Sequence, residues 1–396
     1  MALRPPLPRP RPLPPPLPYL VGVGLTPFGR HDGSSAIGLM AQAAQAALDD
    51  AGMERGQIDG LLCGYATTLP HLMLSTLFVE RFALQPAYAH SVQLGGATGA
   101  ALLMLAGDLV RAGRCRRVLV VAGENRLSGQ ARDSAIQTLA QVGDADMEVP
   151  NGASVPAYYA LLAARYLHET GTTEADLAEL AVLMRRHAQA HPGAQLRSPL
   201  SVADVLASKP IATPLKLADC CPISDGAAAL VVAADPSGGP GPRVLLRGAG
   251  QAHRHQHLSA LQSVLACGAA EAAQRALAEA GVAPAQIGHL ALYDSFTITL
   301  AMLLEELGFA PRGGSAALAR AGHFGPQGAL PLNLHGGLLS YGHCGVAGGM
   351  AHAVEAVLQL GGRAGVRQGR AATHALVHAD GGVMSSHVSL VLTREA

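Results

Sequence analysis

Short apolar runs alternate along the chain with longer runs in which apolar residues recur every three or four positions. The short runs, bounded by glycine or proline, predict buried strands, and the longer runs predict helices with one buried face. We expect strands over 20–23, 58–65, 117–122, 227–233, 243–246 and 375–378. We expect helices over 34–51, 72–82, 97–112, 158–169, 173–190 and 350–360. The pattern therefore predicts a mixed α/β protein.

Part of this pattern occurs twice. Residues 47–65 (ALDDAGMERGQIDGLLCGY) align without a gap with residues 276–294 (ALAEAGVAPAQIGHLALYD). A glycine-rich stretch follows each copy, GGATG at 95–99 and NLHGGLLSYGHCGVAGG at 333–349, and each precedes a helix and then a strand. The order predicts two related halves about a pseudo-twofold axis, with both glycine-rich helix starts near the middle.

The glycine-rich stretches suggest a binding surface for negative charge. Glycines let backbone N–H groups approach a ligand closely, and the start of a helix adds partial positive charge. The functional interpretation is an active-site wall that stabilises an oxyanion, and the alternative is a turn between packed elements. Because two such stretches occur in the same order, we favour the site.

The texture of the sequence suggests four regions. Residues 1–18 are half proline and predict a disordered arm, for which a proline-rich recognition motif is the alternative. Residues 19–125 form an N-terminal half that 211–240 completes, and 241–396 form a C-terminal half. Residues 126–210 are more polar and mostly helical, which predicts an inserted region. Within it, Thr173 and Asp176 have the spacing of a capping box.

Composition excludes several classes of partner. Lys+Arg and Asp+Glu both number 28, so the chain lacks the basic excess of proteins that bind nucleic acid or membrane surfaces. Trp is absent and aromatic residues are 4%, which argues against stacking platforms for bases. No apolar run is long enough for a membrane span. The low charged fraction suggests buried helix faces and an oligomer.

The six cysteines have no CxxC spacing, so neither a zinc site nor a disulfide framework is expected, and a reducing cytoplasm is the natural compartment. The histidines show no metal-binding spacing, so we expect no metal and no metal-dependent aldolase. His335, His378 and His387 are either pocket residues or core histidines. Lys209 and Lys216 lie outside the glycine-rich stretches, which argues against a Schiff-base enzyme.

From residue 19 to residue 392 the chain resembles the thiolase superfamily. The markers are VGVGLTPFG at 21–29, SDGAAA at 224–229, YDSFT at 293–297, the glycine-rich stretch at 336–343 and GGVMSSH at 381–387. The resemblance implies a five-layered α-β-α-β-α fold, a dimer and an acyl-coenzyme A substrate. Thiolases carry a nucleophilic cysteine where this chain has Gly96, and biosynthetic thiolases carry a second cysteine where this chain has His378. The usual covalent route is therefore not expected.

Within this superfamily the chain resembles the cysteine-less aldolases of steroid side-chain degradation and the sterol carrier protein X-like thiolases. The aldolases cleave a β-hydroxyacyl-CoA by a retro-aldol reaction with tyrosines in the site, and Tyr293 and Tyr341 match that pattern. Where they usually have proline after the motif histidine, this chain has Cys344. The resemblance implies coenzyme A only as part of the substrate and no tightly bound cofactor. It also implies a homodimer, or a heterotetramer with a small zinc-ribbon and OB-fold protein.

A retro-aldol cleavage needs a base for the β-hydroxyl proton, a hole for the thioester enolate and an acid for its carbon. We expect Tyr293 as the base, with Asp294 or His343 tuning its pKa. His343 and the backbones of the glycine-rich stretches would polarise the thioester carbonyl, and Tyr341 would protonate the enolate or orient a hydroxyl group. The set of oxyanion and substrate-binding residues is completed by Gly96, Asp294, Gly336 and Gly382.

Three alternatives stay open at this stage. Each tyrosine is otherwise a packing residue with a satisfied hydroxyl. Cys344 is otherwise a relocated nucleophile for an acyltransferase, although a buried inert thiol is the commoner behaviour of cysteine. The whole chain is otherwise a non-catalytic thiolase-like subunit. The sequence identifies neither the acyl group nor the direction of the reaction.

Overall fold

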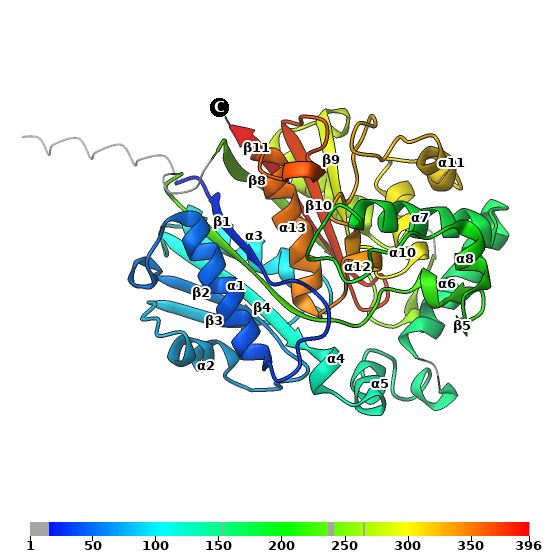
Figure 1. The fold of residues 1–396 in the computed structure, drawn as a ribbon, viewed down its shortest axis with the longest axis horizontal. Coiled ribbons are helices and arrows are strands. Elements are labelled where there is room, and N and C mark those ends of the chain that lie inside the picture. Colours follow the sequence, from blue (N-terminus) through cyan, green and yellow to red (C-terminus); the bar gives the residue numbers. More distant parts are fainter. Residues whose placement is uncertain (1–15, 153, 237–240, 264–265, 396) are drawn as a thin grey trace, which may run out of the picture.

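The strands form a sheet whose two halves have the same strand order (Figure 1). The computed structural model describes residues 16–152, 154–236, 241–263 and 266–395, so most of the expected arm over 1–18 lies outside the described residues. The sheet runs β3-β2-β4-β7-β1-β8-β11-β10-β9. These strands are β1 (Tyr19–Leu25), β2 (Gly60–Gly64), β3 (Tyr88–Val92), β4 (Arg117–Asn125), β7 (Asp225–Ala233), β8 (Arg243–His253), β9 (Ile287–Leu292), β10 (His374–Gly381) and β11 (Ser386–Glu395).

The order β2-β4-β7-β1 in the first half recurs as β9-β10-β11-β8 in the second. In both halves the first pair is parallel and the next two pairs are antiparallel. The halves join where β1 meets β8, through the pair Tyr19 and Leu245. The repeat expected from the sequence is therefore confirmed, and it relates the two halves of the sheet.

Helices cover both outer faces of the sheet and fill the space between its halves. Helix α1 (Ala36–Ala51) packs on β1, β7 and β4, and α9 (Ala269–Ala280) packs on β8 and β11. Between them, α3 (Thr98–Arg111) and α13 (Val346–Leu360) contact each other and strands of both halves. Figure 1 shows α13, in orange, near the centre of the molecule. This arrangement confirms the expected α-β-α-β-α layers.

Glycines in equivalent strands bring each outer helix unusually close to the sheet. A Cβ placed on Gly24 of β1 would lie 2.1 Å from the carbonyl oxygen of Ala43 in α1. A Cβ placed on Gly250 of β8 would lie 2.4 Å from the carbonyl oxygen of Ala272 in α9. Only glycine permits this approach at either position. The strand expected at 243–246 continues to His253 as β8. Gly250 lies within this strand beneath α9 and does not end it.

The connection between β4 and β7 is mainly helical, and we propose that it is an insertion into the first half. It contains α4 (Arg126–Gly129), α5 (Arg132–Ala140), α6 (Val155–Thr170), α7 (Glu174–Ala188), α8 (Val202–Ala207) and the hairpin strands β5 (Pro210–Ala212) and β6 (Leu215–Lys216). The expected capping box is present, since Thr173 accepts from the Asp176 N–H and the Asp176 carboxylate accepts from the Thr173 N–H. Helices α6 and α7 contact α10, which connects the insertion to the second half.

The remaining helices are short and lie in loops between these elements. They are α2 (Leu74–Arg81), α10 (Thr297–Glu306), α11 (Ser315–Arg320) and α12 (Gly337–Ser340), with 3₁₀ helices η1 (Arg55–Gln57), η2 (Val149–Asn151), η3 (Leu217–Asp219), η4 (Leu258–Ala260), η5 (Pro284–Gln286) and η6 (Gly365–Arg367). Strands β3 and β11 were not expected. Strand β3 is a partly exposed edge, and β11 carries buried polar residues that bond to β10, so neither shows a simple apolar pattern.

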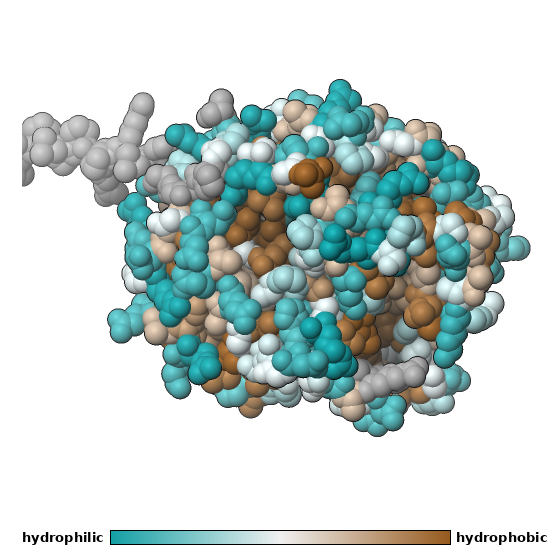
Figure 2. All heavy atoms as spheres, in the orientation of Figure 1, coloured by the Kyte–Doolittle hydropathy of each residue, from teal (hydrophilic) through white to brown (hydrophobic). Residues whose placement is uncertain are grey.

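Hydrophilic residues cover most of the face drawn in Figure 2, and hydrophobic residues gather in the hollows between them. The large apolar core beneath combines residues of the sheet, α3, α6, α10 and α13. Within the described ranges, no helix has the length and hydrophobicity needed to cross a membrane.

Candidate active site

The two glycine-rich stretches meet at a tyrosine–histidine pair. Tyr293 directly follows β9, and its hydroxyl oxygen lies 2.8 Å from Nε2 of His343, which precedes α13. The rings meet edge to face with centroids 6.0 Å apart. Tyr293 is 5% exposed and His343 is partly exposed, so His343 is the more accessible member of the pair. The structure thus brings together two of the residues singled out by sequence.

Gly96 lies against this pair, just before α3. A Cβ placed on Gly96 would lie 2.4 Å from the Tyr293 hydroxyl oxygen and 2.4 Å from the carbonyl oxygen of Asp380. Separations this short do not occur between non-bonded atoms, so no side chain fits at position 96 while Tyr293 keeps its place. The phenol hydroxyl therefore fills the space into which a side chain at position 96 would grow.

The hydrogen bonds of His343 indicate its tautomer. The backbone N–H of Gly345 points at Nδ1 of His343 over 3.3 Å, so Nδ1 is an acceptor. In a neutral ring the proton then lies on Nε2, which donates to the Tyr293 oxygen. Burial, helped by the charge of Arg126, lowers the pKa of His343 to about 3, which keeps the ring neutral. The hydrogen of the Tyr293 hydroxyl is left to bind another acceptor.

Charge around Tyr293 acts in both directions. Burial raises the pKa of the Tyr293 phenol well above its usual value, and the carboxyl group of Asp380 raises it further. The guanidinium group of Arg126 opposes this shift. Arg126 is held by the Thr67 hydroxyl, to which its Nε donates over 3.1 Å. At neutral pH the resting pair is therefore an uncharged phenol and an uncharged imidazole.

Asp294 supports the segment that carries His343. It is fully buried, and its Oδ1 accepts from the Leu338 N–H over 2.7 Å and lies 3.2 Å from Nε2 of His352. A Cβ on Gly337 would lie 1.9 Å from the Asp294 carboxylate, so glycine is needed at this contact. Asp294 therefore positions the glycine-rich segment, whereas the sequence had suggested contact with the substrate.

Tyr341 lies away from the pair. It is 1% exposed, its hydroxyl is 3.4 Å from the carbonyl oxygen of Thr26, and its ring packs on Phe28 and His191. In the described part of the chain, its hydroxyl has no hydrogen bond to Tyr293 or His343. The structure thus gives Tyr341 a packing environment and does not bring it to the other candidates.

Gly336 and Gly382 also occupy different surroundings. A Cβ on Gly336 would lie 2.5 Å from the Ala188 side chain, so this glycine permits contact with α7. Gly382 has φ +68°, and its N–H lies beside the first glycine-rich stretch, 2.9 Å from a Cβ placed on Gly95. Of these two glycines, Gly382 is the one that lies beside the first glycine-rich stretch.

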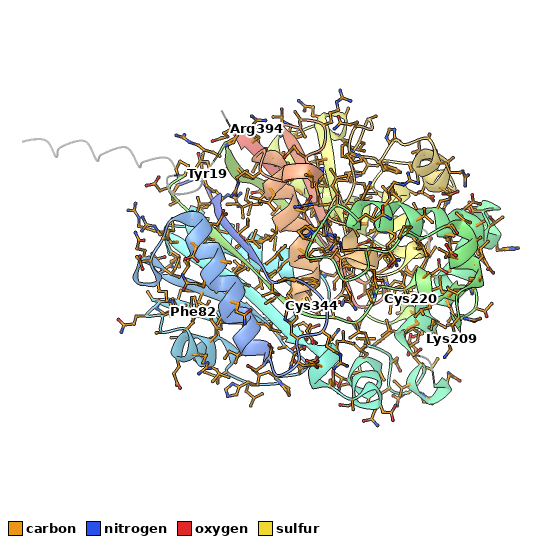
Figure 3. All side chains as sticks on the ribbon, viewed as in Figure 1. Tyr19, Phe82, Lys209, Cys220, Cys344 and Arg394 are labelled. Carbon is orange, nitrogen blue, oxygen red and sulfur yellow. The ribbon has the colours of Figure 1, made fainter. Side chains whose placement is uncertain are left out.

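The thiol and amine groups considered from sequence lie in surroundings that do not activate them. Cys344 is fully buried, and burial raises the pKa of its thiol well above the usual value. Figure 3 shows Cys344 beside α13 near the centre of the molecule and Lys209 towards the edge. Lys216 forms an ion pair with Glu174. These positions suit neither a nucleophilic thiolate nor a Schiff-base lysine.

The core interpretation holds for the histidines near the site. His378 bonds to Ser389 and His387, and His335 bonds to His352. All four rings are buried. Among the described residues, no group of three or more His, Cys, Asp or Glu side chains could hold a metal ion.

Sequence reasoning missed Asp380 and Tyr159. Asp380 is 1% exposed, and its Oδ2 accepts from the Tyr159 hydroxyl over 3.2 Å. Burial raises the pKa of Asp380 to about 7. The available signal was an acidic residue between a buried strand and the GGVMSSH motif. Tyr159 lies in the insertion, 221 residues away, and nothing in the sequence links the two.

Together these groups bring a protonated phenol, a neutral imidazole and backbone from both glycine-rich stretches to one point. A phenol supported by an N–H donor can exchange a proton with a substrate oxygen or carbon. The starts of α3 and α13 add partial positive charge near the same point. The arrangement suits acid–base chemistry at a carbonyl compound.

Comparison with known proteins agrees with this geometry. Residues 250–394 match the family described as "Thiolase C-terminal domain-like". A steroid side-chain-cleaving aldolase of Thermomonospora curvata is 33% identical, over 94% of this chain and 97% of the relative. An acetyl-CoA acetyltransferase of Methanothermobacter thermautotrophicus is 30% identical, over 92% of this chain and 96% of the relative.

A solved structure described as an "Ltp2-ChsH2(DUF35) aldolase" superposes with a TM-score of 0.82 and 31% identity. The superposition covers 96% of this chain and 99% of that chain. Relatives of this similarity extend over nearly the whole sequence, and their fold agrees with the five layers and the two related halves. The chain belongs to the thiolase superfamily.

Proposed function

We propose that the protein is a thiolase-like aldolase, a carbon–carbon lyase that cleaves or forms a β-hydroxyacyl-CoA without a covalent cysteine intermediate. The observation that carries the proposal is the Tyr293 hydroxyl, which occupies the space beside Gly96 that a nucleophilic side chain would need. The aldolases among the relatives support the same reaction class.

In the proposed cleavage, Tyr293 takes the proton of the substrate β-hydroxyl group. The oxygen left behind forms a carbonyl, the Cα–Cβ bond breaks, and its electron pair moves into the thioester enolate. Tyr293 then returns a proton to the α-carbon, so the products are an aldehyde or ketone and a shortened acyl-CoA. Because the resting phenol is protonated, it must pass its own proton to a neighbour as it accepts the substrate's proton.

We assign His343 and the glycine backbones to the enolate and to the phenol. The Nε2–H of His343 stabilises negative charge on the Tyr293 oxygen and lies near the expected thioester oxygen. The N–H groups of Gly96 and Gly382 are the proposed oxyanion donors, and each such donor is worth roughly 3 kcal/mol in comparable sites. Tyr341 and Gly336 have no part in this proposal because they face other elements. Asp294 acts indirectly, by holding the segment before His343.

The proposed substrate is an acyl-CoA thioester, and coenzyme A enters only as part of it. We also propose a protein partner. The solved aldolase contains a second component, named ChsH2(DUF35), and the similarity of the chains supports a comparable complex here. A homodimer is the proposed assembly of the chain itself, in the cytoplasm.

A second candidate function is thiolase-type acyl transfer, which the acetyl-CoA acetyltransferase relative favours. It requires a nucleophile, and Cys344 is the residue that sequence suggested. The buried position of that thiol argues against the alternative.

The test is product analysis with a panel of synthetic β-hydroxyacyl-CoA thioesters, with and without a DUF35-type partner protein. The aldolase assignment predicts a carbonyl compound and a shortened acyl-CoA in equal amounts, without added free coenzyme A. Products that appear only when free coenzyme A is added indicate thiolytic acyl transfer instead. A chain inert towards every thioester, alone and with its partner, supports the non-catalytic role.

A further inference from the structure

Asp380 is a buried acid that forms no ion pair within the described part of the chain. It lies at the end of β10, and its Oδ1 has no hydrogen-bond partner among the described residues. Its Oδ2 accepts from the Tyr159 hydroxyl, which is also 3.2 Å from the Gly382 carbonyl oxygen. Buried carboxyl groups are usually paired or fully hydrogen-bonded, because an isolated buried charge is costly. The backbone N–H groups of Met384 and of Asp380 itself also lower the pKa of this carboxyl group, but burial outweighs them. A buried carboxyl group with no cation beside it in the described ranges therefore needs an explanation.

The position of Asp380 links it to the proton-transfer pair. The backbone carbonyl oxygen of Asp380 and the Tyr293 hydroxyl oxygen border the same space beside Gly96. The backbone N–H of Tyr293 donates to the His378 carbonyl oxygen, two residues before Asp380 on the same strand. The charge of Asp380 raises the pKa values of both Tyr293 and Tyr159, so the three groups are electrostatically coupled.

Among the titratable groups around Asp380 that have shifted pKa values, Asp380 is the one whose pKa lies near neutrality. Tyr159 from α6 and Tyr293 after β9 have pKa values raised above their usual range. Cys267, in the loop before α9, also has a raised pKa. His387 of β11 pairs with Asp380 in the strand register, and burial lowers its pKa to about 4. Burial raises the pKa of Asp380 itself to about 7.

Tyr159 is placed to hold the carboxyl group. Its ring stacks on Phe296 with centroids 4.3 Å apart, and its hydroxyl reaches both Asp380 and Gly382. Its ring is fixed by α6 of the insertion on one side and by the second half on the other. The hydrogen bond from Tyr159 also lowers the pKa of Asp380, against the larger effect of burial.

We infer that the Asp380 carboxylate, held by Tyr159, accepts the proton that Tyr293 releases when Tyr293 takes the β-hydroxyl proton of the substrate. This inference rests on the proposed aldolase function. Asp380 becomes a carboxylic acid while the Cα–Cβ bond breaks, and Tyr293 ends this step as a neutral phenol. When Tyr293 protonates the enolate carbon, Asp380 returns its proton to the phenol, so no proton is gained or lost in the cycle. Asp380 acts through Tyr293 and is a positioning residue for proton flow.

The test uses α-proton exchange, which needs no knowledge of the acyl group that is cleaved. The full-length chain is incubated in D₂O with acetyl-CoA and with propionyl-CoA, and deuterium at the α-carbon is measured by mass spectrometry between pH 5.5 and 9. In the wild type, exchange should rise with pH through about 7, as Asp380 ionises. Asp380→Asn should lower exchange about 100-fold or more at pH 8 and remove this inflection.

Two controls separate this role from a structural one. Affinity for free coenzyme A, measured by calorimetry, should stay within about twofold in Asp380→Asn. Asp219→Asn removes another buried acid with a raised pKa, which bonds to Thr297, and should exchange at the wild-type rate. Exchange by Asp380→Asn within about threefold of the wild type, or an inflection that persists, overturns the inference.

Tyr159→Phe decides the question if Asp380→Asn fails to fold. The variant keeps the stacked ring and loses the hydrogen bond that lowers the pKa of Asp380. Its inflection should therefore move to higher pH, and an unmoved inflection contradicts the inference. A wild-type chain that neither exchanges nor cleaves any thioester overturns the aldolase proposal, and this inference with it, whereas an active wild type with a fully active Asp380→Asn overturns the inference alone.

Discussion

At the scale of single residues, the site depends on which atoms occupy the space beside Gly96. The Tyr293 hydroxyl fills space that only a glycine at position 96 leaves open, and His343 donates to the same oxygen. A phenol hydroxyl, to which we assign proton transfer, therefore lies where thiolases carry their nucleophilic cysteine. The consequences can be tested at each position.

Tyr293→Phe should lower turnover of a β-hydroxyacyl-CoA by about 10²–10⁴-fold, because it removes the proton-transfer oxygen and leaves the ring. Tyr341→Phe is the matched control, since it removes another buried hydroxyl whose contact with Thr26 is long. Steady-state kinetics on both variants provides the measurement. Equal losses in the two variants would mean that burial of a phenol, rather than its position, determines activity.

Gly96→Ala should lower turnover by about 100-fold, because the added methyl group must displace the Tyr293 hydroxyl by an ångström or more. Gly99→Ala, in the same helix start, meets the flexible Met350 side chain instead and should keep most activity. Comparison of kcat for the two variants tests this. Unchanged turnover in Gly96→Ala would show that the hydroxyl need not occupy this place.

Asp380 should make stability depend on pH. Its folded pKa of about 7 lies above the usual value for aspartate, so the native state favours the protonated form. Its contribution is fully present at low pH and is lost as pH rises to about 7. Between pH 5 and pH 8, Asp380→Asn should therefore gain on the order of 2–3 kcal/mol relative to the wild type. Denaturant unfolding at both pH values measures this difference, and a constant difference contradicts it.

At the scale of elements, the two halves reuse one packing arrangement. The glycines of β1 and β8 admit α1 and α9 to equivalent depths, and the sheet order repeats around them. The same arrangement places the starts of α3 and α13 in the middle layer, where the glycine-rich stretches meet.

Gly24→Ala and Gly250→Ala should each destabilise the fold by about 1–3 kcal/mol or more, because each added Cβ meets a backbone carbonyl that moves only with its helix. Gly56→Ala is the control, since a Cβ there meets nothing within 4 Å. Unfolding free energies of the three variants check this. A loss confined to one half would mean that the repeated packing is not equally important in both.

The sequence was sufficient for the two related halves because the repeat spans a helix, its glycine stop and a buried strand, whereas the layers were implied by the resemblance to thiolases. It was also sufficient to single out Tyr293 and His343, which lie inside short motifs and which the structure brings together, while their roles stay predictions. It was insufficient for Tyr341, whose direction depends on packing against Phe28 and His191. Asp380 could not be paired with Tyr159, because only the fold brings these distant residues together.

At the scale of the whole molecule, the chain keeps a thiolase fold, and we propose that its covalent chemistry is replaced. The N-termini of the central helices α3 and α13 lie close together, where their partial positive charge can stabilise an oxyanion. The thiol of Cys344 is buried and Lys209 is exposed. The Tyr293–His343 pair therefore carries the side chains that suit proton transfer there.

The most direct test of the central claim is the intact mass of the protein during turnover of a β-hydroxyacyl-CoA that it cleaves, before and after treatment with iodoacetamide. We predict a carbonyl product and a shortened acyl-CoA, an unmodified protein mass throughout, and the same turnover after alkylation. An acyl adduct on Cys344, together with loss of turnover after alkylation, would contradict the account.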